Sequence, residues 1–382
     1  MSFDVPRVCT LTTVFTTTFV MAANGQQPVR WSIDVRPAVT IGGNERDTSS
    51  FLQTVVGATR LPSGSILVGD RGDFALRFFT SRGSPLRSVA RRGSGPGEVR
   101  YLARLFRCGD SVFTYDIGEG QRVSVFTLAG RFVRTFRFGA PQAARSPYQS
   151  ACNRHGEFVH MGWERQRDMK GGIFRSIVPI WTSRTDSSVG RVIDSLPGSE
   201  RWGLVVDNQF RGTRPLPLGK QPVLGIGESA IFIGSADRFQ IRVVSRTGET
   251  IAALQRAEPP MAVTRTDIQE AIEREIANRG ESSRKDVEAA YAAMNFPATL
   301  PAYTDLRVDS ENLVWIRPYP RGSPTSVRWS VFDPKGVLVA EVDLPTHLEV
   351  FEIGTDYVLG RYLDPAEAIP QVRLYHFKRQ PR

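Results

Sequence analysis

Seven residues with polar or aromatic side chains stand at or shortly after one position of a repeated sequence pattern, where together they could bind a polar ligand. When the copies of the pattern are aligned on the turn before their second apolar run, charged residues fall at the far end of that run and further residues follow it. The set is Asp70, Arg71, Asp116, Trp163, Arg317, Tyr319 and Arg361. Aromatic rings beside charged groups suit a polar ligand with a flat or sugar-like face.

Two interpretations of this column of residues remain open. In the first, the column surrounds a ligand, with acids in the early copies, arginines in the late ones, and open space at Gly162 and Gly234 of the middle copies. Arg361 of the last copy could then pair with Asp70 of the first. In the second, a charged residue that ends a strand only fixes the following loop or bridges to the next copy.

The repeat predicts the elements that position these residues. Clear copies span 61–86, 108–133, 227–251 and 309–339, and weaker ones span 155–193 and 354–378. Their apolar runs are short, rich in Val, Ile, Phe and Trp, and bounded by Gly, Asp, Asn or Pro, which is typical of strands and tight turns. Six copies of such a unit predict an all-β protein, a six-bladed β-propeller over 26–382.

The last copy lacks an outer strand, so a closed ring must take one from elsewhere. Segment 29–41 precedes the first copy and has the composition of a strand. Pairing it with 374–377 would close the ring and remove exposed strand edges, which otherwise promote aggregation.

A helical hairpin is expected over 264–296, between blades 4 and 5. A capping box that opens at Thr266 predicts the start of the first helix, Gly280 separates the two helices, and Pro297 ends the insert. The hairpin could cover one mouth of the ring or pack on its side, and the sequence leaves both arrangements open.

Residues 1–25 have the features of a signal peptide. The segment 8–23 is uncharged and partly apolar, and it ends in small residues before Gln26. It is too short and too polar to span a bilayer comfortably, so no transmembrane segment is expected. We expect a periplasmic or extracellular protein, with an N-terminal extension or a misplaced start codon as the alternative.

Two cysteines, Cys108 and Cys152, remain after removal of such a leader. Each stands just before the turn that opens the second strand, in adjacent blades. Export permits a disulfide, and equivalent positions in adjacent blades can lie close together. A disulfide and a pair of buried thiols both remain open.

The chain carries a net charge of +10, with arginine scattered through every segment instead of gathered into a stripe. A nucleic-acid partner is therefore not favoured. The four histidines lack the spacing of zinc ligands, and arginines in the column would repel Ca²⁺, which needs six to eight oxygen ligands. We therefore expect no cofactor, although Ca²⁺ stays open.

One connector resembles a known family. Residues 93–99 (GSGPGEV) resemble the GxGPGEF connector of bacterial six-bladed β-propeller proteins related to the NHL-repeat and TolB-like group, and 308–319 (VDSENLVWIRPY) resemble its late blades. Val99 replaces the Phe of the connector. The resemblance implies the fold and carries no information on activity.

The sequence thus favours a secreted, non-catalytic binding or scaffold propeller. We expect a monomer that recognises a small polar ligand, a glycan or a protein at the mouth of its channel. A metal-dependent, lactonase-like hydrolase or lyase is the first alternative, and an NHL-like nucleic-acid binder is the second.

Overall fold

A computed structural model describes residues 28–118, 120–142, 147–163, 170–185, 188, 190–364 and 369–379. The predicted signal peptide of 1–25 lies outside these residues. Within the described part of the chain, no helix is long and apolar enough to cross a membrane.

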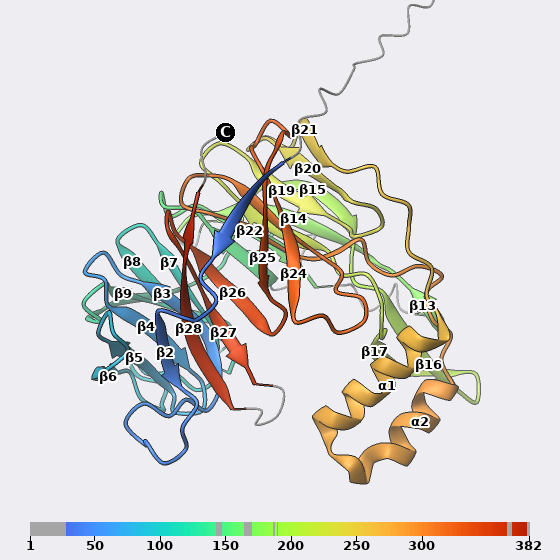
Figure 1. The fold of residues 1–382 in the computed structure, drawn as a ribbon, viewed down its shortest axis with the longest axis horizontal. Helices are drawn as coiled ribbons and strands as arrows, with labels where there is room; N and C mark the ends of the chain where they lie inside the picture. The colour runs from blue at the N-terminus through green and yellow to red at the C-terminus, as the bar shows by residue number, and fades with distance from the viewer. Residues whose placement is uncertain are drawn as a thin grey trace, which may run out of the picture.

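The chain folds into consecutive small antiparallel sheets, each a meander of strands adjacent in sequence, and is a β-propeller (Figure 1). Four of these sheets have four strands. The first comprises β3 (Val55–Arg60), β4 (Ile66–Asp70), β5 (Ala75–Phe79) and β6 (Pro85–Val89). The second comprises β7 (Leu102–Cys108), β8 (Ser111–Asp116), β9 (Arg122–Thr127) and β10 (Phe132–Arg137). The third comprises β11 (Pro147–Cys152), β12 (Phe158–Gly162), β14 (Ile177–Ser183) and β15 (Val192–Pro197). The fourth comprises β18 (Val223–Ile226), β19 (Ile231–Gly234), β20 (Gln240–Val244) and β21 (Thr250–Gln255).

The last two meanders are joined by the N-terminal strands into a sheet of nine strands. The meanders comprise β22 (Tyr303–Val308), β23 (Val314–Pro318), β24 (Ser326–Phe332) and β25 (Leu338–Pro345), then β26 (Leu348–Ile353), β27 (Tyr357–Leu363) and β28 (Pro370–Lys378). Strand β1 (Val29–Ile33) pairs parallel with β25 and antiparallel with β28, and β2 (Val39–Gly42) continues along β28.

The pairing of the N-terminal segment with the last strand agrees with the sequence prediction. Ile33 stands opposite Phe377, and Val39 stands opposite Leu374. The parallel pairing with β25 was not predicted. Trp31 explains why β1 stays between the two meanders, because its buried ring lies 5.8 Å from that of Trp315 and 6.0 Å from that of Phe377.

The first strand of each meander is its inner strand, and these inner strands contact one another in sequence order. Contacts run from β3 to β7, β11, β18, β22 and β26, and β26 in turn contacts β3. Hydrophobic clusters fill the spaces between neighbouring sheets. One of them packs Ile41, Val55 and Leu359 between the last meander and the first.

Two helices and a short 3₁₀ turn stand between β21 and β22: α1 (Arg265–Arg279), η2 (Glu281–Ser283) and α2 (Arg284–Ala292). The predicted cap at Thr266 is wrong. Thr264 is the N-cap, because its extended backbone lets its hydroxyl accept from the Asp267 N–H, while the Asp267 carboxylate accepts from the Thr264 N–H. Figure 1 shows the hairpin beside β16 and β17.

The sequence did not predict the small sheet of β13 (Gly172–Phe174), β16 (Arg201–Val206) and β17 (Gln209–Pro215). Its hairpin turn places Asp207 and Asn208 at φ of 51° and 57°. Two consecutive positive φ values are those of a type I′ turn, which matches the twist of paired strands.

Candidate functional site

The two predicted acidic residues are buried and bonded to the backbone. Asp70 is 0% exposed, and its carboxylate accepts from the backbone N–H of Gln53 at 2.9 Å, of Thr54 at 2.9 Å and of Gly72 at 3.0 Å. Asp70, at the end of β4, therefore holds the segment that leads into β3, the first strand of the same sheet. The first interpretation, in which the column surrounds a ligand, is contradicted at Asp70, since its buried carboxylate is bonded to its own loop and is not presented to a ligand.

Asp116, 1% exposed, repeats this arrangement one blade later. It accepts from the N–H groups of Arg100, Tyr101 and Gly118 at 2.6, 2.9 and 2.9 Å. An arginine of the next strand stands near each acid: Arg77 is 3.8 Å from Asp70, and Arg122 is 3.7 Å from Asp116. The repetition shows that the position serves the fold of the blade.

The two predicted arginines connect neighbouring meanders. Arg317, at the end of β23, donates to the Thr304 hydroxyl at 3.1 Å and to the Thr346 carbonyl at 3.0 Å, just before β26. Arg361, in β27, donates to the Val55 carbonyl of β3 at 2.9 Å and pairs with Glu349. The expected pairing of Arg361 with Asp70 is wrong, because the Asp70 carboxylate is taken up by its own loop.

The glycines of the column do not leave open space. A Cβ at Gly234 would lie 2.1 Å from the hydroxyl of Tyr303, and a Cβ at Gly162 would lie 3.2 Å from side-chain atoms of Pro179 and Trp181. Large side chains from other strands fill both places. Close packing requires glycine at position 234 and leaves little room at position 162, so the expectation of open space is wrong.

Arg71 and Trp163 each lie against a tyrosine. The Arg71 guanidinium stands 4.7 Å from the ring centre of Tyr101 and donates to its hydroxyl at 2.9 Å. Trp163 is 52% exposed, and its ring lies 5.2 Å from that of Tyr148 on inner strand β11. In both cases a residue directly after the second strand of a sheet, β4 or β12, contacts a residue at the beginning of a first strand, β7 or β11.

Tyr319, one of the predicted site residues, lines a cavity. This tyrosine pocket has a volume of about 270 Å³ and lies between the helical hairpin, the loop after β17 and the beginning of β22. Its wall includes Tyr291, Tyr303 and Tyr319, with the polar side chains of Gln221, Arg274, Glu275, Asn278 and Thr304. Three phenol rings therefore meet several hydrogen-bonding groups.

Burial dominates the electrostatics of the pocket. It raises the pKa of Tyr319, although the positive charge of Arg274 and a hydrogen bond with that residue act in the opposite direction. Burial also raises the pKa of Tyr291. The Tyr303 hydroxyl accepts from the Ala236 N–H at 2.8 Å and donates to the Gln240 carbonyl at 3.1 Å. Tyr291 and Tyr319 stay neutral and offer ring faces and hydroxyl groups to a ligand, whereas the hydroxyl of the buried Tyr303 is taken up by the backbone.

Ion pairs join the elements that form the walls of the tyrosine pocket: exposed ones at Arg284 and a largely buried one at Lys220. Arg284 bonds to Glu273 of α1 and to Glu281, which connects the two helices. Opposite the hairpin, Lys220 pairs with Glu200 at 3.3 Å and donates to the Thr299 carbonyl at 3.2 Å. The pocket is therefore formed before any ligand arrives, which reduces the entropy lost on binding.

Charged residues also gather on the inner strands, which the sequence analysis did not consider. Asp305 and Arg307 of β22 pair at 3.1 Å, and Arg307 donates to the Val350 carbonyl of β26 at 2.7 Å. Arg104 of β7 donates to the Tyr148 carbonyl of β11 at 2.8 Å. The signal was present, since Arg104 in β7, Asp305 and Arg307 in β22, and Glu349 in β26 all stand within first strands.

A local irregularity in strand pairing immediately precedes two of these residues, Arg104 and Asp305. The register shifts between Leu102 and Arg104 in β7, and between Tyr303 and Asp305 in β22. An extra residue in one strand turns the following side chain away from its regular direction. Arg104 and Asp305 both follow such a shift directly.

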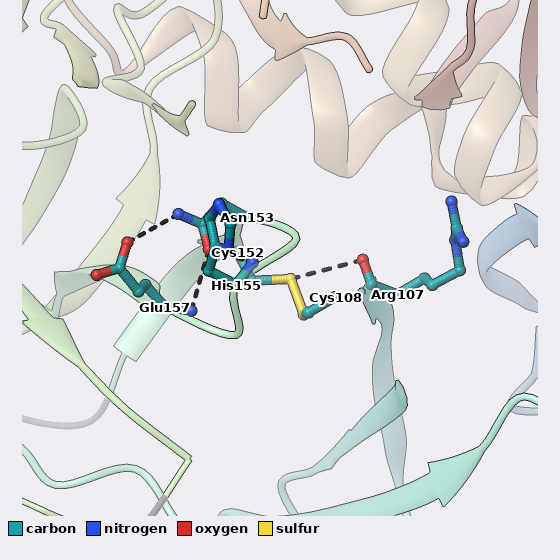
Figure 2. Close-up of a disulfide and its surroundings, with 6 residues drawn as sticks. All are labelled: Arg107, Cys108, Cys152, Asn153, His155 and Glu157. Carbon is teal, nitrogen blue, oxygen red and sulfur yellow. Dashed lines mark hydrogen bonds between the residues drawn. A yellow bond between two sulfur atoms is a disulfide. The ribbon is translucent and has the colours of Figure 1, made fainter. Parts of the chain in front are cut away.

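The two inner strands β7 and β11 are joined covalently at their ends. Cys108 and Cys152 form a disulfide with their Cα atoms 5.9 Å apart. Figure 2 shows the bridge beside the Arg107 carbonyl and the turn in which Asn153 accepts from the His155 N–H and donates to Glu157. Of the two possibilities left open by the sequence, the structure has the disulfide.

Among the described residues, no group of three or more His, Cys, Asp or Glu is placed to hold a metal ion.

The GSGPGE connector is organised by Glu98, whose carboxylate accepts from the Gly95 N–H at 2.9 Å and pairs with Arg91. A Cβ at Gly93 would collide with that carboxylate at 2.1 Å. A side chain at position 93 would therefore displace the Glu98 carboxylate from its bond with Gly95.

No family model matches the sequence, and no curated protein matches it either. Solved structures do resemble it. A member of the DUF4221 family from Bacteroides vulgatus has a TM-score of 0.51 at 10% identity, over 93% of this chain and 100% of that chain. A protein of unknown function from Bacteroides thetaiotaomicron has a TM-score of 0.43 at 10% identity, over 91% and 77% of the two chains. Regucalcin, a calcium-binding protein from Agrobacterium tumefaciens, has a TM-score of 0.40 at 10% identity, over 92% and 98%. At such identities the likeness to the DUF4221 protein concerns the fold alone, and the chain shares a propeller fold with it.

Proposed function

We propose that this protein is an exported, non-catalytic binding propeller that holds a small polar ligand, such as a sugar residue of a glycan, in the tyrosine pocket. The ring has six blades and is closed by β1 and β2 along β28. The α1–α2 hairpin is an insert between blades 4 and 5 that covers one side of the mouth.

The hydrophobic clusters support six blades in a closed ring. Each of the six clusters fills the space between one sheet and the next, including the space between the last meander and the first. An open arc of six blades would bury only five such spaces. The pairs of Ile33 with Phe377 and of Val39 with Leu374 support closure by the N-terminal segment.

The observation that carries the ligand class is the lining of the tyrosine pocket. Tyr291 and Tyr319 offer ring faces to the apolar side of a sugar, while Asn278 and Gln221 offer amides to its hydroxyl groups. A volume of about 270 Å³ admits a ligand of one or two sugar rings. Arg274 and Glu275 already bond to Tyr319 and Arg279, which supports holding a ligand over reacting with it.

Two features support export. The N-terminal 25 residues have the order of regions of a signal peptide. The disulfide between Cys108 and Cys152 is of a kind that persists in oxidising compartments.

Isothermal titration of purified protein against a panel of monosaccharides and disaccharides tests the proposal. Tyr319→Ala removes a ring of the pocket and should weaken binding of the selected sugar by about tenfold or more. Tyr319→Phe keeps the ring and should retain most of the affinity. Tyr101→Ala, which removes an exposed tyrosine outside the pocket, is the matched control. Equal loss in Tyr319→Ala and Tyr101→Ala, or no loss in either, would contradict the assignment.

A further inference from the structure

Six charged residues form a cluster inside the ring, on or beside the inner strands of blades 2, 5 and 6. This interior cluster consists of residues joined by ion pairs or by electrostatic interaction, namely Arg104, Asp305, Arg307, Arg317, Glu349 and Arg361. Four cations face two carboxylates, which leaves an excess of two positive charges. The inner strands contact one another in the order β3, β7, β11, β18, β22, β26 and back to β3. Strands β7 and β22 therefore stand opposite each other in this order.

Only two of the four arginines are neutralised by the carboxylates of the cluster. Arg307 pairs with Asp305 at 3.1 Å, and Arg361 pairs with Glu349 at 2.5 Å. Arg104 and Arg317 donate to neutral oxygens, those of Tyr148, Thr304 and Thr346. Across the residues that the structure describes, neither of these two guanidinium groups has a carboxylate within 4 Å.

The two arginines without carboxylate partners are poorly solvated. Burial lowers the pKa of Arg104, and the nearby positive charge of Arg307 lowers it further. Burial also lowers the pKa of Arg317. Charged groups away from water are normally paired, because an uncompensated charge there is costly. The negative charges of Glu349 and Asp305 act on Arg104 and Arg317 in the opposite direction without forming an ion pair with them. The interior cluster as a whole still carries two more positive charges than negative ones.

Solvent nevertheless reaches the interior cluster. The side chains of Arg307 and Asp305 are 29% and 22% exposed, and those of Arg361 and Glu349 are 36% and 46% exposed. Arg104 and Arg317 are themselves partly exposed, so a small solute can also approach the two guanidinium groups that lack carboxylate partners. Planar guanidinium groups bind oxyanions through parallel N–H donors.

We propose that the interior of the ring binds a small oxyanion, such as phosphate or sulfate, between Arg104 on one side and Arg307 and Arg317 on the other. The anion supplies the negative charge that the cluster lacks. This site is separate from the tyrosine pocket, although Thr304 touches both, since it lines the pocket and accepts from Arg317. The proposal relies on the closed ring and does not depend on the sugar.

Thermal unfolding and titration calorimetry with sodium sulfate and sodium phosphate test the site, with sodium chloride at equal ionic strength as the reference. Arg104→Gln removes one charge and keeps an amide that can donate to Tyr148. Arg131→Gln, at an exposed turn between β9 and β10, makes the same charge change elsewhere. We expect millimolar sulfate to stabilise the wild type and Arg131→Gln equally, and to bind Arg104→Gln at least about tenfold more weakly.

A second readout separates a loss of binding from a loss of folding. In chloride alone, Arg104→Gln should unfold at the same temperature as the wild type or higher, because it removes repulsion with Arg307. Stabilisation of Arg104→Gln by sulfate to the same extent as the wild type would overturn the proposal, as would the absence of any specific effect in the wild type.

Two further arms identify the source of the oxyanion and its relation to the proposed function. A sugar phosphate that binds more tightly than inorganic phosphate, and loses this advantage in Tyr319→Ala, indicates a phosphate carried by the ligand of the pocket. Equal binding of both indicates a free ion. Sulfate binding that survives in Tyr319→Ala supports the interior site even if no sugar binds.

Discussion

Arg321 pairs with Asp267 at 2.7 Å, and this ion pair joins the loop after β23 to the first turn of α1. Asp267 is buried, and its carboxylate also accepts from the backbone and the hydroxyl of Thr264. A single carboxylate therefore caps the helix and attaches the hairpin to the ring.

Removing this attachment should loosen the hairpin without unfolding the ring. Arg321→Ala leaves a buried carboxylate with fewer partners, at a cost of about 1–3 kcal/mol confined to the hairpin. Limited proteolysis should then cut within 264–296 several times faster than in the wild type, while the main thermal transition changes little. Arg82→Ala, in an exposed turn, is the control, and equal cleavage rates in all three proteins would contradict the prediction.

The stability of the protein should fall below neutral pH because of His160. Its ring is 0% exposed, lies between the hydroxyls of Ser150 and Ser183 at 2.8 and 2.7 Å, and packs on Phe138 and Trp181. Burial lowers the pKa of His160 to about 3. Folding thus requires the neutral ring, whereas the unfolded chain takes up a proton below its ordinary pKa of about 6.5.

The direction in which stability changes with pH follows from this difference in protonation. The contribution of His160 is fully present above pH 6.5 and is lost as the pH falls, by about 1.4 kcal/mol per pH unit. Urea unfolding at pH 7, 6 and 5 measures the slope. His160→Gln keeps two hydrogen-bonding atoms and should flatten the slope, at a constant cost at pH 7. An unchanged slope in His160→Gln would refute the assignment to this residue.

The disulfide between Cys108 and Cys152 should stabilise the junction of blades 2 and 3. Closing a loop of this length in the unfolded chain corresponds to about 4 kcal/mol, and measured values are typically about 2–4 kcal/mol. Cys108→Ser, Cys152→Ser and the double variant should all lose this amount, because either change breaks the same bond. If the double variant lost the sum of the stability losses of the two single variants, the disulfide would not be the source of the stabilisation.

Asp70 and Asp116 distinguish the two interpretations that the sequence left open. Asp70→Ala leaves the N–H groups of Gln53, Thr54 and Gly72 without an acceptor, which should cost about 3 kcal/mol or more. Ligand affinity, measured below the new unfolding temperature, should not change. Asp34→Ala, at an exposed acid before β2, is the control. If Asp70→Ala bound the ligand more weakly while its free energy of unfolding did not change, Asp70 would be a ligand-binding residue.

The sequence predicted the strands well because each apolar run and each turn is a local feature. It located the pairing of 29–41 with 374–377 from the incomplete last copy alone. It missed the sheet of β13, β16 and β17, since segments such as 209–215 (QFRGTRP) lack apolar alternation and pair only within an insertion. It placed the cap of α1 two residues late, because Thr264 and Thr266 offer the same side chain.

The site was predicted less well for a physical reason. The alignment compared only the ends of second strands, where several residues serve the blade itself, as Asp70 and Asp116 do. Gly234 suggested space, yet Tyr303 from the next meander fills it. The pocket depends on contacts between Tyr319 and helical residues such as Arg274, and no spacing along the chain indicates that contact.

The pairing of β1 and β2 with β28 has a consequence for the order of folding. The first described strand and the last one hold each other by backbone hydrogen bonds, although nearly the whole chain lies between them in sequence. A chain that emerges from its N-terminus can form its early meanders one by one, but β1 must wait for its partner. Strands β1 and β2 therefore stay unpaired until β25 and β28 have been made, and unpaired strands promote aggregation and proteolysis during that interval.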